Sequence, residues 1–143
     1  MQISQMQQSD LLKISDILQT EFDDFWNFNV FSTELQNENS TYFVAKIDDE
    51  IVGFAGVWND TFDFHITNIV TKKKYRHQGI GTKLLETLIN FSKEKQTNSL
   101  TLEVNENNAQ AISLYEKYNF KKIGIRKNYY SQNENAIIMT LYF

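Results

Sequence analysis

The chain has 143 residues, of which 41% are hydrophobic and 14% are aromatic. This supply of apolar side chains is typical of a packed domain, and we expect a single domain over residues 1–143. The formal net charge of −4 disfavours broad binding to nucleic acid, which needs a basic surface. The absence of cysteine excludes disulfides, thiolate metal sites and a cysteine nucleophile.

No apolar run in the sequence approaches the ~20 residues that a membrane-spanning helix needs. The first residues, MQISQMQQSDLLK, also lack the charged and apolar regions of a secretory signal. We therefore expect a cytoplasmic protein that does not bind a membrane.

The spacing of apolar residues predicts strands and helices in the order β-α-α-β-β-β-α-β-α-β-β. The first helix is expected over residues 9–22, with Ser9 as its N-cap and an apolar face of Leu11, Leu12, Ile14, Ile17 and Leu18. Further helices are expected at 31–38, 80–95 and 108–118, and strands at 1–6, 41–47, 51–58, 62–71, 99–104, 121–127 and 136–143. This order predicts an α/β fold of the α+β kind, with a mixed sheet of about seven strands and helices on both faces.

The stretch YRHQGIGTKLLETL places Gly79 and Gly81 between an expected strand and an amphipathic helix. The N-terminus of a helix offers unpaired N–H groups that bind anions, and glycine lets a phosphate approach the backbone closely. The stretch is not a P-loop, because its lysine does not have the required spacing from the first glycine. It is not a dinucleotide fingerprint either, because Leu84 stands where that motif needs a small residue. Arg76 and the run of Lys72 to Lys74 favour an anion site over a flexible turn with a solvated basic face.

Five stretches carry a resemblance to a known family. RHQGIG resembles the pyrophosphate loop, R/Q-x-x-G-x-G/A, of the GCN5-related N-acetyltransferases (GNAT). LTLEVNENNAQAISLYEKYNF and RKNYYSQNENAIIM resemble the ribosomal-protein-alanine, or RimI-type, branch of that family, and FWNFNVFSTEL and HITNIV are similar to its upstream segments. The resemblance implies the GNAT fold and acetyl-CoA as co-substrate.

The resemblance also implies how this co-substrate is held. Backbone groups of one strand end would face its acetyl and pantetheine portions, at Ile69, Val70 and Thr71. The loop and helix start would hold the pyrophosphate through Arg76, His77, Gln78, Gly79, Ile80, Gly81 and Thr82. A second helix would add a contact with the co-substrate through Asn108. No metal is expected, since His65 and His77 have no partner at ligand spacing.

An amine attacks a thioester only when neutral, and an N-terminal amine has a pKa of about 7.7–8.0, so a base is needed. Glu103 is the only carboxylate of the strand SLTLEV and lies on its polar face. The resemblance implies that Glu103 is the base and that Tyr115 donates a proton to the coenzyme A sulfur. From the residues alone, Glu103 could be an ordinary polar-face residue, Tyr115 a core aromatic and Asn108 a helix cap.

Substrate residues are predicted on two segments. Tyr129 and Tyr130, with Trp26, could wall a slot for the first residues of a peptide, or could pack near a strand end. Asp63 and His65 could meet the incoming ammonium group, or could belong to a solvated hairpin end.

The resemblance implies transfer of acetyl to the N-terminal α-amino group of an alanine-first ribosomal protein by a monomer or weak dimer. Asn105 and Asn135 stand where the branch has arginine and aspartate, which could shift the peptide preference. One alternative is a GNAT enzyme for a small amine, such as an amino acid, polyamine or drug, or for a lysine side chain. Another is a non-catalytic acetyl-CoA-binding regulator, which the presence of both Glu103 and Tyr115 disfavours.

Overall fold

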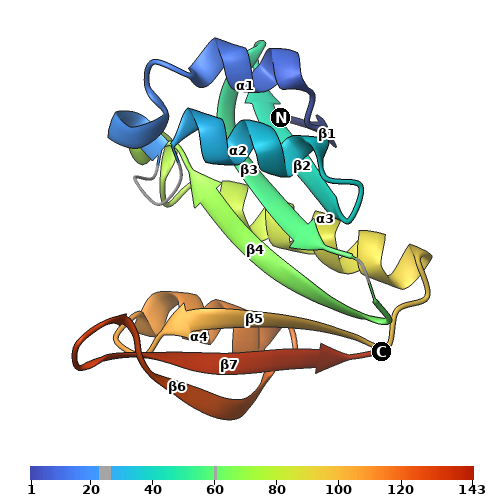
Figure 1. Ribbon diagram of the computed structural model, residues 1–143, viewed down its shortest axis with the longest axis vertical. Coiled ribbons are helices and arrows are strands. Elements are labelled where there is room, and N and C mark those ends of the chain that lie inside the picture. Colours follow the sequence, from blue (N-terminus) through green and yellow to red (C-terminus); the bar gives the residue numbers. More distant parts are fainter. Residues whose placement is uncertain (23–26, 60) are drawn as a thin grey trace.

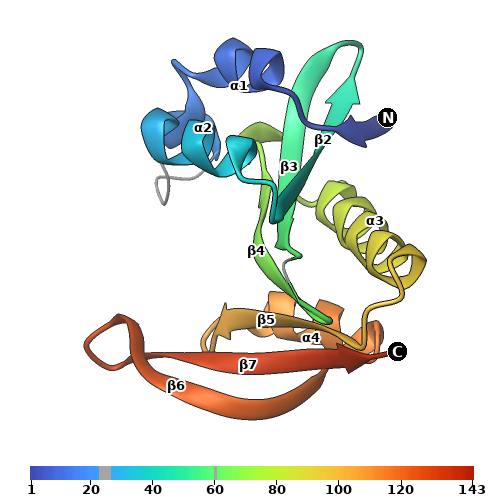
Figure 2. The same ribbon diagram turned by 45° about the vertical axis from the view of Figure 1, so that its right-hand side comes forward.

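The computed structural model describes residues 1–22, 27–59 and 61–143, which form one mixed sheet with helices on both faces (Figures 1 and 2). The described residues contain seven strands in the spatial order β1-β2-β3-β4-β5-β7-β6. Their bounds are β1 Gln2–Gln5, β2 Ser40–Ile47, β3 Glu50–Trp58, β4 Asp63–Thr71, β5 Ser99–Asn105, β6 Lys121–Ser131 and β7 Glu134–Tyr142. The predicted fold class is confirmed.

Four α-helices are described, α1 (Gln8–Ile14), α2 (Phe28–Gln36), α3 (Ile80–Glu94) and α4 (Ala109–Lys117), with a π turn at Leu18–Phe22 and a 3-10 turn at Lys73–Tyr75. One core lies between α1, α2 and one face of β2–β4, and includes Leu11, Phe22, Phe31, Val44 and Phe54. The other lies under α3 and α4 and includes Val52, Leu84, Leu88, Leu102 and Ile112. No helix in the described ranges is long and apolar enough to cross a membrane.

The central strands β4 and β5 run parallel but pair only at their beginnings, where Asp63–His65 face Ser99–Thr101. Beyond this point the two strands diverge, as Figures 1 and 2 show. In β4, the register with β3 skips Thr67, and such a bulge bends a strand. The hydroxyl of Thr67 lies 2.9 Å from that of Tyr42. The divergence opens a gap at the carboxyl ends of two neighbouring strands, where α/β proteins bind their ligands.

The first helix differs from the prediction at both ends. Its N-cap is Gln7 and not Ser9, because the Asp10 carboxylate accepts the Gln7 N–H at 2.8 Å and is held there by Lys46 at 2.9 Å. The α-helix ends at Ile14 instead of running to residue 22. Leu12 is 61% exposed, since it lies about 100° around the helix from Leu11 and outside the buried stripe.

The remaining boundaries agree with the prediction more closely. The predicted helix at 80–95 is α3, and the predicted turn after residue 47 contains Asp48 and Asp49, both with positive φ. The β6 strand extends to Ser131, four residues beyond the predicted end, and therefore carries both Tyr129 and Tyr130. The 3-10 turn before the glycines was not predicted.

Candidate active site

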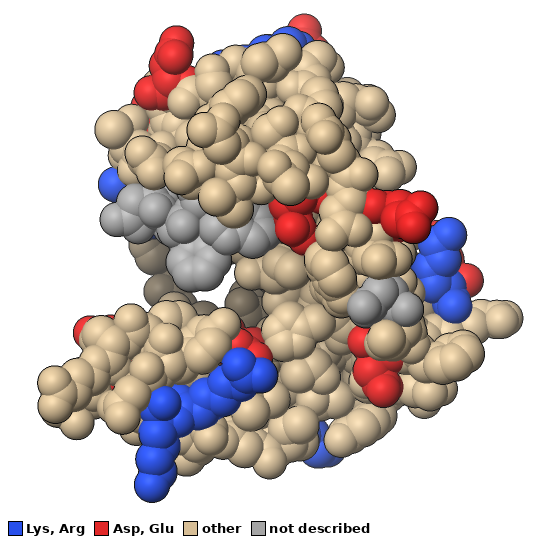
Figure 3. All heavy atoms as spheres, viewed as in Figure 1, with Lys and Arg blue, Asp and Glu red and all other residues tan. Residues whose placement is uncertain are grey.

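The gap between β4 and β5 is a cleft of about 510 Å³. Figure 3 shows the molecule hollowed between the part that carries β2–β4 and the part that carries β5–β7. The cleft brings together seven residues that the sequence predicts for a site, from β4, β5, the start and body of α4, and β6: His65, Ile69, Glu103, Asn108, Tyr115, Tyr129 and Tyr130.

The Glu103 side chain is only 8% exposed, and residues of two other strands hold it. Its Oε1 lies 3.4 Å from Nε of Arg126 on β6 and 3.7 Å from Nε2 of His65 on β4. The phenol of Tyr129 also interacts with this carboxylate. The alternation of β5 places Glu103 on the face opposite Leu102 and Val104, which are buried. A carboxylate held in this way can accept a proton from a group entering the cleft.

The ionisable neighbours of Glu103 have shifted pKa values. Burial lowers the pKa of His65 below its ordinary value, Arg126 acts in the same direction, and Glu103 opposes them. His65 is therefore neutral at pH 7. The pKa of Tyr129 is raised chiefly by its interaction with Glu103 and, to a smaller extent, by burial. Burial, together with nearby charges, raises the pKa of Tyr130 to about 12.

Tyr115 lies on α4 and lines the same cleft as Glu103 of β5. Its ring packs against Phe120, with 5.8 Å between the ring centroids. Burial raises the pKa of its phenol. The hydroxyl therefore keeps its proton at neutral pH and can give it to a stronger base formed in the cleft.

The start of α4 meets both the cleft and the glycine loop. The Asn108 side chain accepts the N–H of Ala111 at 3.1 Å, so this residue is the N-cap that its surroundings suggested. Asn108 also lines the cleft. Nε2 of Gln110, the second residue of α4, lies 3.4 Å from Nδ1 of His77, which links the glycine loop to α4.

The glycine loop leaves the first turn of α3 open. Gly79 is its N-cap, in the left-handed region at φ +84°, and a Cβ there would meet no atom of the described residues within 4 Å. A Cβ on Gly81 would lie 3.7 Å from Oγ1 of Thr71, at the end of β4. The N–H groups at the start of an α-helix have no partner within the helix. This arrangement can hold a phosphate between α3 and the end of β4.

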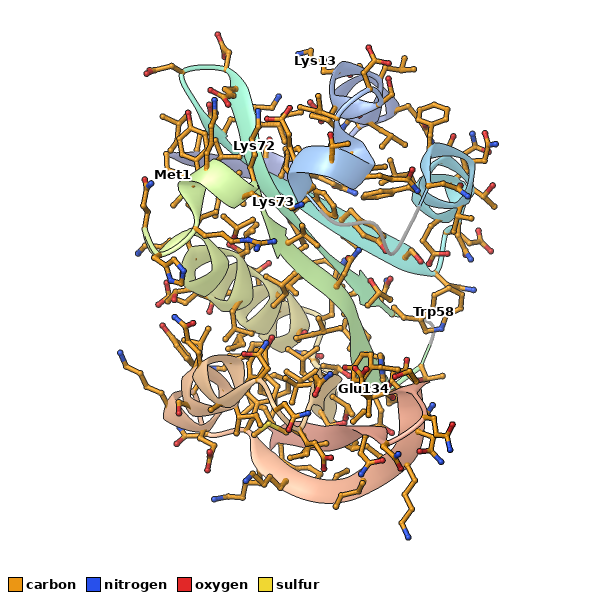
Figure 4. The ribbon with its side chains drawn as sticks, turned by 90° about the vertical axis from the view of Figure 1, so that its left-hand side faces the viewer. Met1, Lys13, Trp58, Lys72, Lys73 and Glu134 are labelled. Carbon is orange, nitrogen blue, oxygen red and sulfur yellow. The ribbon has the colours of Figure 1, made fainter. Side chains whose placement is uncertain are left out.

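The first lysine of the basic run before the glycines does not act as the sequence suggested. Lys72 is buried, and its Nζ lies 2.9 Å from Oε2 of Glu50 and 3.8 Å from Oε1 of Glu21. Glu50 also accepts the Tyr75 hydroxyl at 2.8 Å, and these hydrogen bonds lower its pKa to about 2. The interpretation of Lys72 as anion-site charge is therefore wrong. Figure 4, which looks onto the open side of the cleft, shows Lys72 and Lys73 where the chain leaves β4.

The other predicted residues lie as follows. Arg76 Nη2 is 3.4 Å from the Phe22 carbonyl oxygen. The side chains of Val70 and Ile80 are buried in the two cores, while Gln78 is exposed and Thr82 half-buried. Asp63 does not line the cleft; it lies where β4 and β5 are paired and accepts the Ser99 hydroxyl at 2.8 Å. Trp26 lies outside the described residues.

Comparison with known proteins decides the family. The model of the acetyltransferase (GNAT) family matches residues 11–120. The chain belongs to this GNAT family. It is therefore an N-acetyltransferase.

Relatives of this GNAT enzyme match over nearly the whole chain. A Bacillus subtilis protein is 36% identical over 96% of the chain and 92% of its own length. The "[Ribosomal protein bS18]-alanine N-acetyltransferase" of Haemophilus influenzae is 34% identical over 98% of the chain and 97% of its own length. The crystal structure of the ribosomal-protein-S18-alanine N-acetyltransferase from Escherichia coli has a TM-score of 0.89 and 33% identity, covering 99% and 92% of the two chains.

Sequence reasoning on this GNAT enzyme missed two features of the site. Arg126 belongs to the R-x-x-Y-Y segment but was given no role, although its position three residues before Tyr129 was visible. The contact of His65 with Glu103 was also missed, and only the order of the strands reveals it. Within the described ranges, no three His, Cys, Asp or Glu side chains gather as metal ligands.

Proposed function

We propose that this GNAT enzyme transfers an acetyl group from acetyl-CoA to the N-terminal α-amino group of a protein that begins with alanine. The observation that carries the proposal is the nearly buried Glu103 carboxylate in a cleft that Tyr115 also lines. The names of the Haemophilus and Escherichia relatives support a ribosomal protein as the acceptor. We also propose that the chain works as one cytoplasmic domain, as a monomer or weak dimer.

Acetyl-CoA supplies an activated acetyl group, and the chain offers places for its parts. The uncovered first turn of α3, from Gly79 to Thr82, suits the pyrophosphate, with Arg76, His77 and Gln78 beside it. The backbone of β4 at Ile69, Val70 and Thr71 suits the pantetheine, because no described strand pairs with β4 on the β5 side there. Asn108 adds a contact from α4.

Glu103 and Tyr115 divide the proton transfers between them. Glu103 accepts a proton from the acceptor ammonium, directly or through water, and so produces the neutral amine that can attack. Tyr115 donates its proton to the sulfur that leaves. Each role agrees with the chemistry of the side chain. A carboxylate can accept a proton, and a phenol with a raised pKa keeps its proton at neutral pH.

The acceptor is proposed to enter beside β6. Tyr129 and Tyr130 are 44% and 41% exposed and stand edge to face, with 5.0 Å between their ring centroids. Such rigid rings suit a narrow slot that admits a small first residue and reads the backbone behind it. The net charge of −4 favours the approach of a basic peptide, an effect that salt weakens.

An acceptor panel tests the proposal. The protein is incubated with acetyl-CoA and either an alanine-first basic peptide, free alanine, a polyamine, or an N-terminally blocked peptide with one lysine, and mass spectrometry locates the acetyl group. We expect acetylation at the α-amino group of the alanine peptide. Acetylation of the polyamine or the blocked peptide, with the alanine peptide untouched, would instead favour a small amine or a lysine side chain as substrate.

A further inference from the structure

His65 is a half-buried imidazole that no step of the proposed mechanism uses. It lies on β4, opposite Thr101 of β5 and Trp58 of β3, at the place where β4 and β5 begin to diverge. Its Nε2 is 3.7 Å from Oε1 of Glu103. The His65 side chain is 39% exposed, whereas that of Glu103 is 8% exposed. The imidazole therefore stands between the buried carboxylate and solvent.

The proton balance of the reaction requires that one proton leave the active site for solvent in each turnover. An N-terminal ammonium loses two protons when its nitrogen forms the C–N bond of the amide. As the C–S bond breaks, the sulfur takes the proton of the Tyr115 hydroxyl, and Tyr115 regains one of the two protons that leave the nitrogen. The other proton is on Glu103 and must reach solvent before the next turnover. A carboxylate that is 8% exposed has little direct contact with water.

We propose that His65 relays this proton from Glu103 to solvent, a role that rests on the proposed function. Imidazole is ordinarily a stronger base than a carboxylate, so neutral His65 is a group that can accept the proton from protonated Glu103. Rotation of either side chain, or one bridging water, brings the two groups within hydrogen-bond reach.

The charges around His65 suit a relay better than a fixed ion pair. Burial and the Arg126 guanidinium lower the pKa of His65, while Glu103 acts in the opposite direction. The phenol of Tyr129 also interacts with Glu103. Asp63, two residues before His65 on β4, is bonded to Ser99. A neutral imidazole with a lowered pKa accepts a proton at pH 7 and returns it readily to water.

Imidazole rescue of the His65→Gln variant tests the relay. Glutamine keeps much of the size and polarity of histidine but does not titrate at neutral pH. At pH 7 in PIPES, a bulky anionic buffer, we expect kcat for the alanine peptide to fall about tenfold, below the ~10²–10⁴-fold loss for a primary acid or base. Added imidazole should restore the rate of H65Q and leave the wild type unchanged. A folded variant with the wild-type rate, or with a loss that imidazole does not restore, would overturn the relay.

A second measurement does not depend on the acceptor. Titration of the His65 ring by NMR in the wild type and in Glu103→Gln should show a lower pKa in the variant, because the carboxylate no longer favours the charged imidazole. An unchanged pKa would remove the coupling that the relay needs. If the wild type acetylates no amine of the panel, the proposed function fails, whereas an active wild type with an unaffected H65Q refutes the relay alone.

Discussion

Replacing Gly81 with alanine should stabilise the protein and weaken its binding of acetyl-CoA. Gly81 is the second residue of α3, and a Cβ there would lie 3.7 Å from Thr71 Oγ1, an ordinary van der Waals contact. Because glycine is a poor helix former, the alanine variant should gain about 0.5 kcal/mol, the lower end of the range for helix interiors. For a chain of this length, that gain should raise Tm by about 1–2 °C.

The same methyl group would lie where we place the phosphates. If it pushes one phosphate oxygen off one backbone N–H, the loss is a charge-assisted hydrogen bond of about 1.5–3 kcal/mol. Kd for acetyl-CoA should then rise about 10- to 150-fold. Gly81→Val should raise it further, because its branched side chain fills more of the path. Thermal unfolding and isothermal titration calorimetry measure the two effects separately.

The control is Asn90→Ala, an exposed site of the same helix roughly 15 Å from its N-terminus. Asparagine is also a poor helix former, so this variant should show a similar gain in Tm with unchanged affinity. A folded Gly81→Val protein that binds acetyl-CoA as tightly as the wild type would refute the placement of the phosphates at the start of α3.

Three further predictions concern ionisable groups. Glu103→Gln should lower kcat by ~10²–10⁴-fold with acetyl-CoA affinity nearly intact; a wild-type rate at neutral pH would exclude Glu103 as the base. Tyr115→Phe should slow turnover, and a rate unchanged by this substitution would exclude the hydroxyl as the acid. Because burial raises the pKa of Tyr115, the wild type should lose activity at a pH above the ordinary pKa of tyrosine. Glu50 has a folded-state pKa of about 2 against an ordinary 4.5, so its contribution to stability is present above pH 4.5 and is lost as the pH falls toward 2. Glu50→Gln should remove this acid dependence and lower Tm at pH 7, because Lys72 loses the nearer of its two carboxylate partners; an identical acid unfolding curve would contradict the network.

The parts of the fold that follow from local spacing could be predicted from the sequence. The apolar stripe of α3 locates that helix within one residue at its C-terminal end, and the alternation of β5 places Glu103 opposite the buried Leu102 and Val104. Both patterns depend on residues that are close in the sequence. There, the side-chain period of a helix or a strand decides which face of the element is buried. The glycine loop was found for the same reason, since its two glycines adjoin the helix that they begin.

The parts that depend on distant residues could not be predicted in this way. The N-cap of α1 lies at Gln7 because Lys46, on another element, holds Asp10 in place. Lys72 appeared to belong to a solvated basic run, but Glu50 and Glu21 neutralise it from 22 and 51 positions away along the chain. Nothing in the spacing around these residues indicates which distant carboxylate will meet them.

The surroundings of Glu103 show most clearly why strand order matters for the site. Alternation alone predicts its face, but His65 reaches it because β4 lies beside β5, and Arg126 reaches it although β7 separates β6 from β5. Two strand spacings are roughly 10 Å, which only a long side chain can cross. The β7 residue in register with Arg126 is Ala136, whose side chain is a single methyl group. The order β4-β5-β7-β6 therefore supplies both neighbours of the proposed base, one on each side, and a chain with the same strands in another order would lack them.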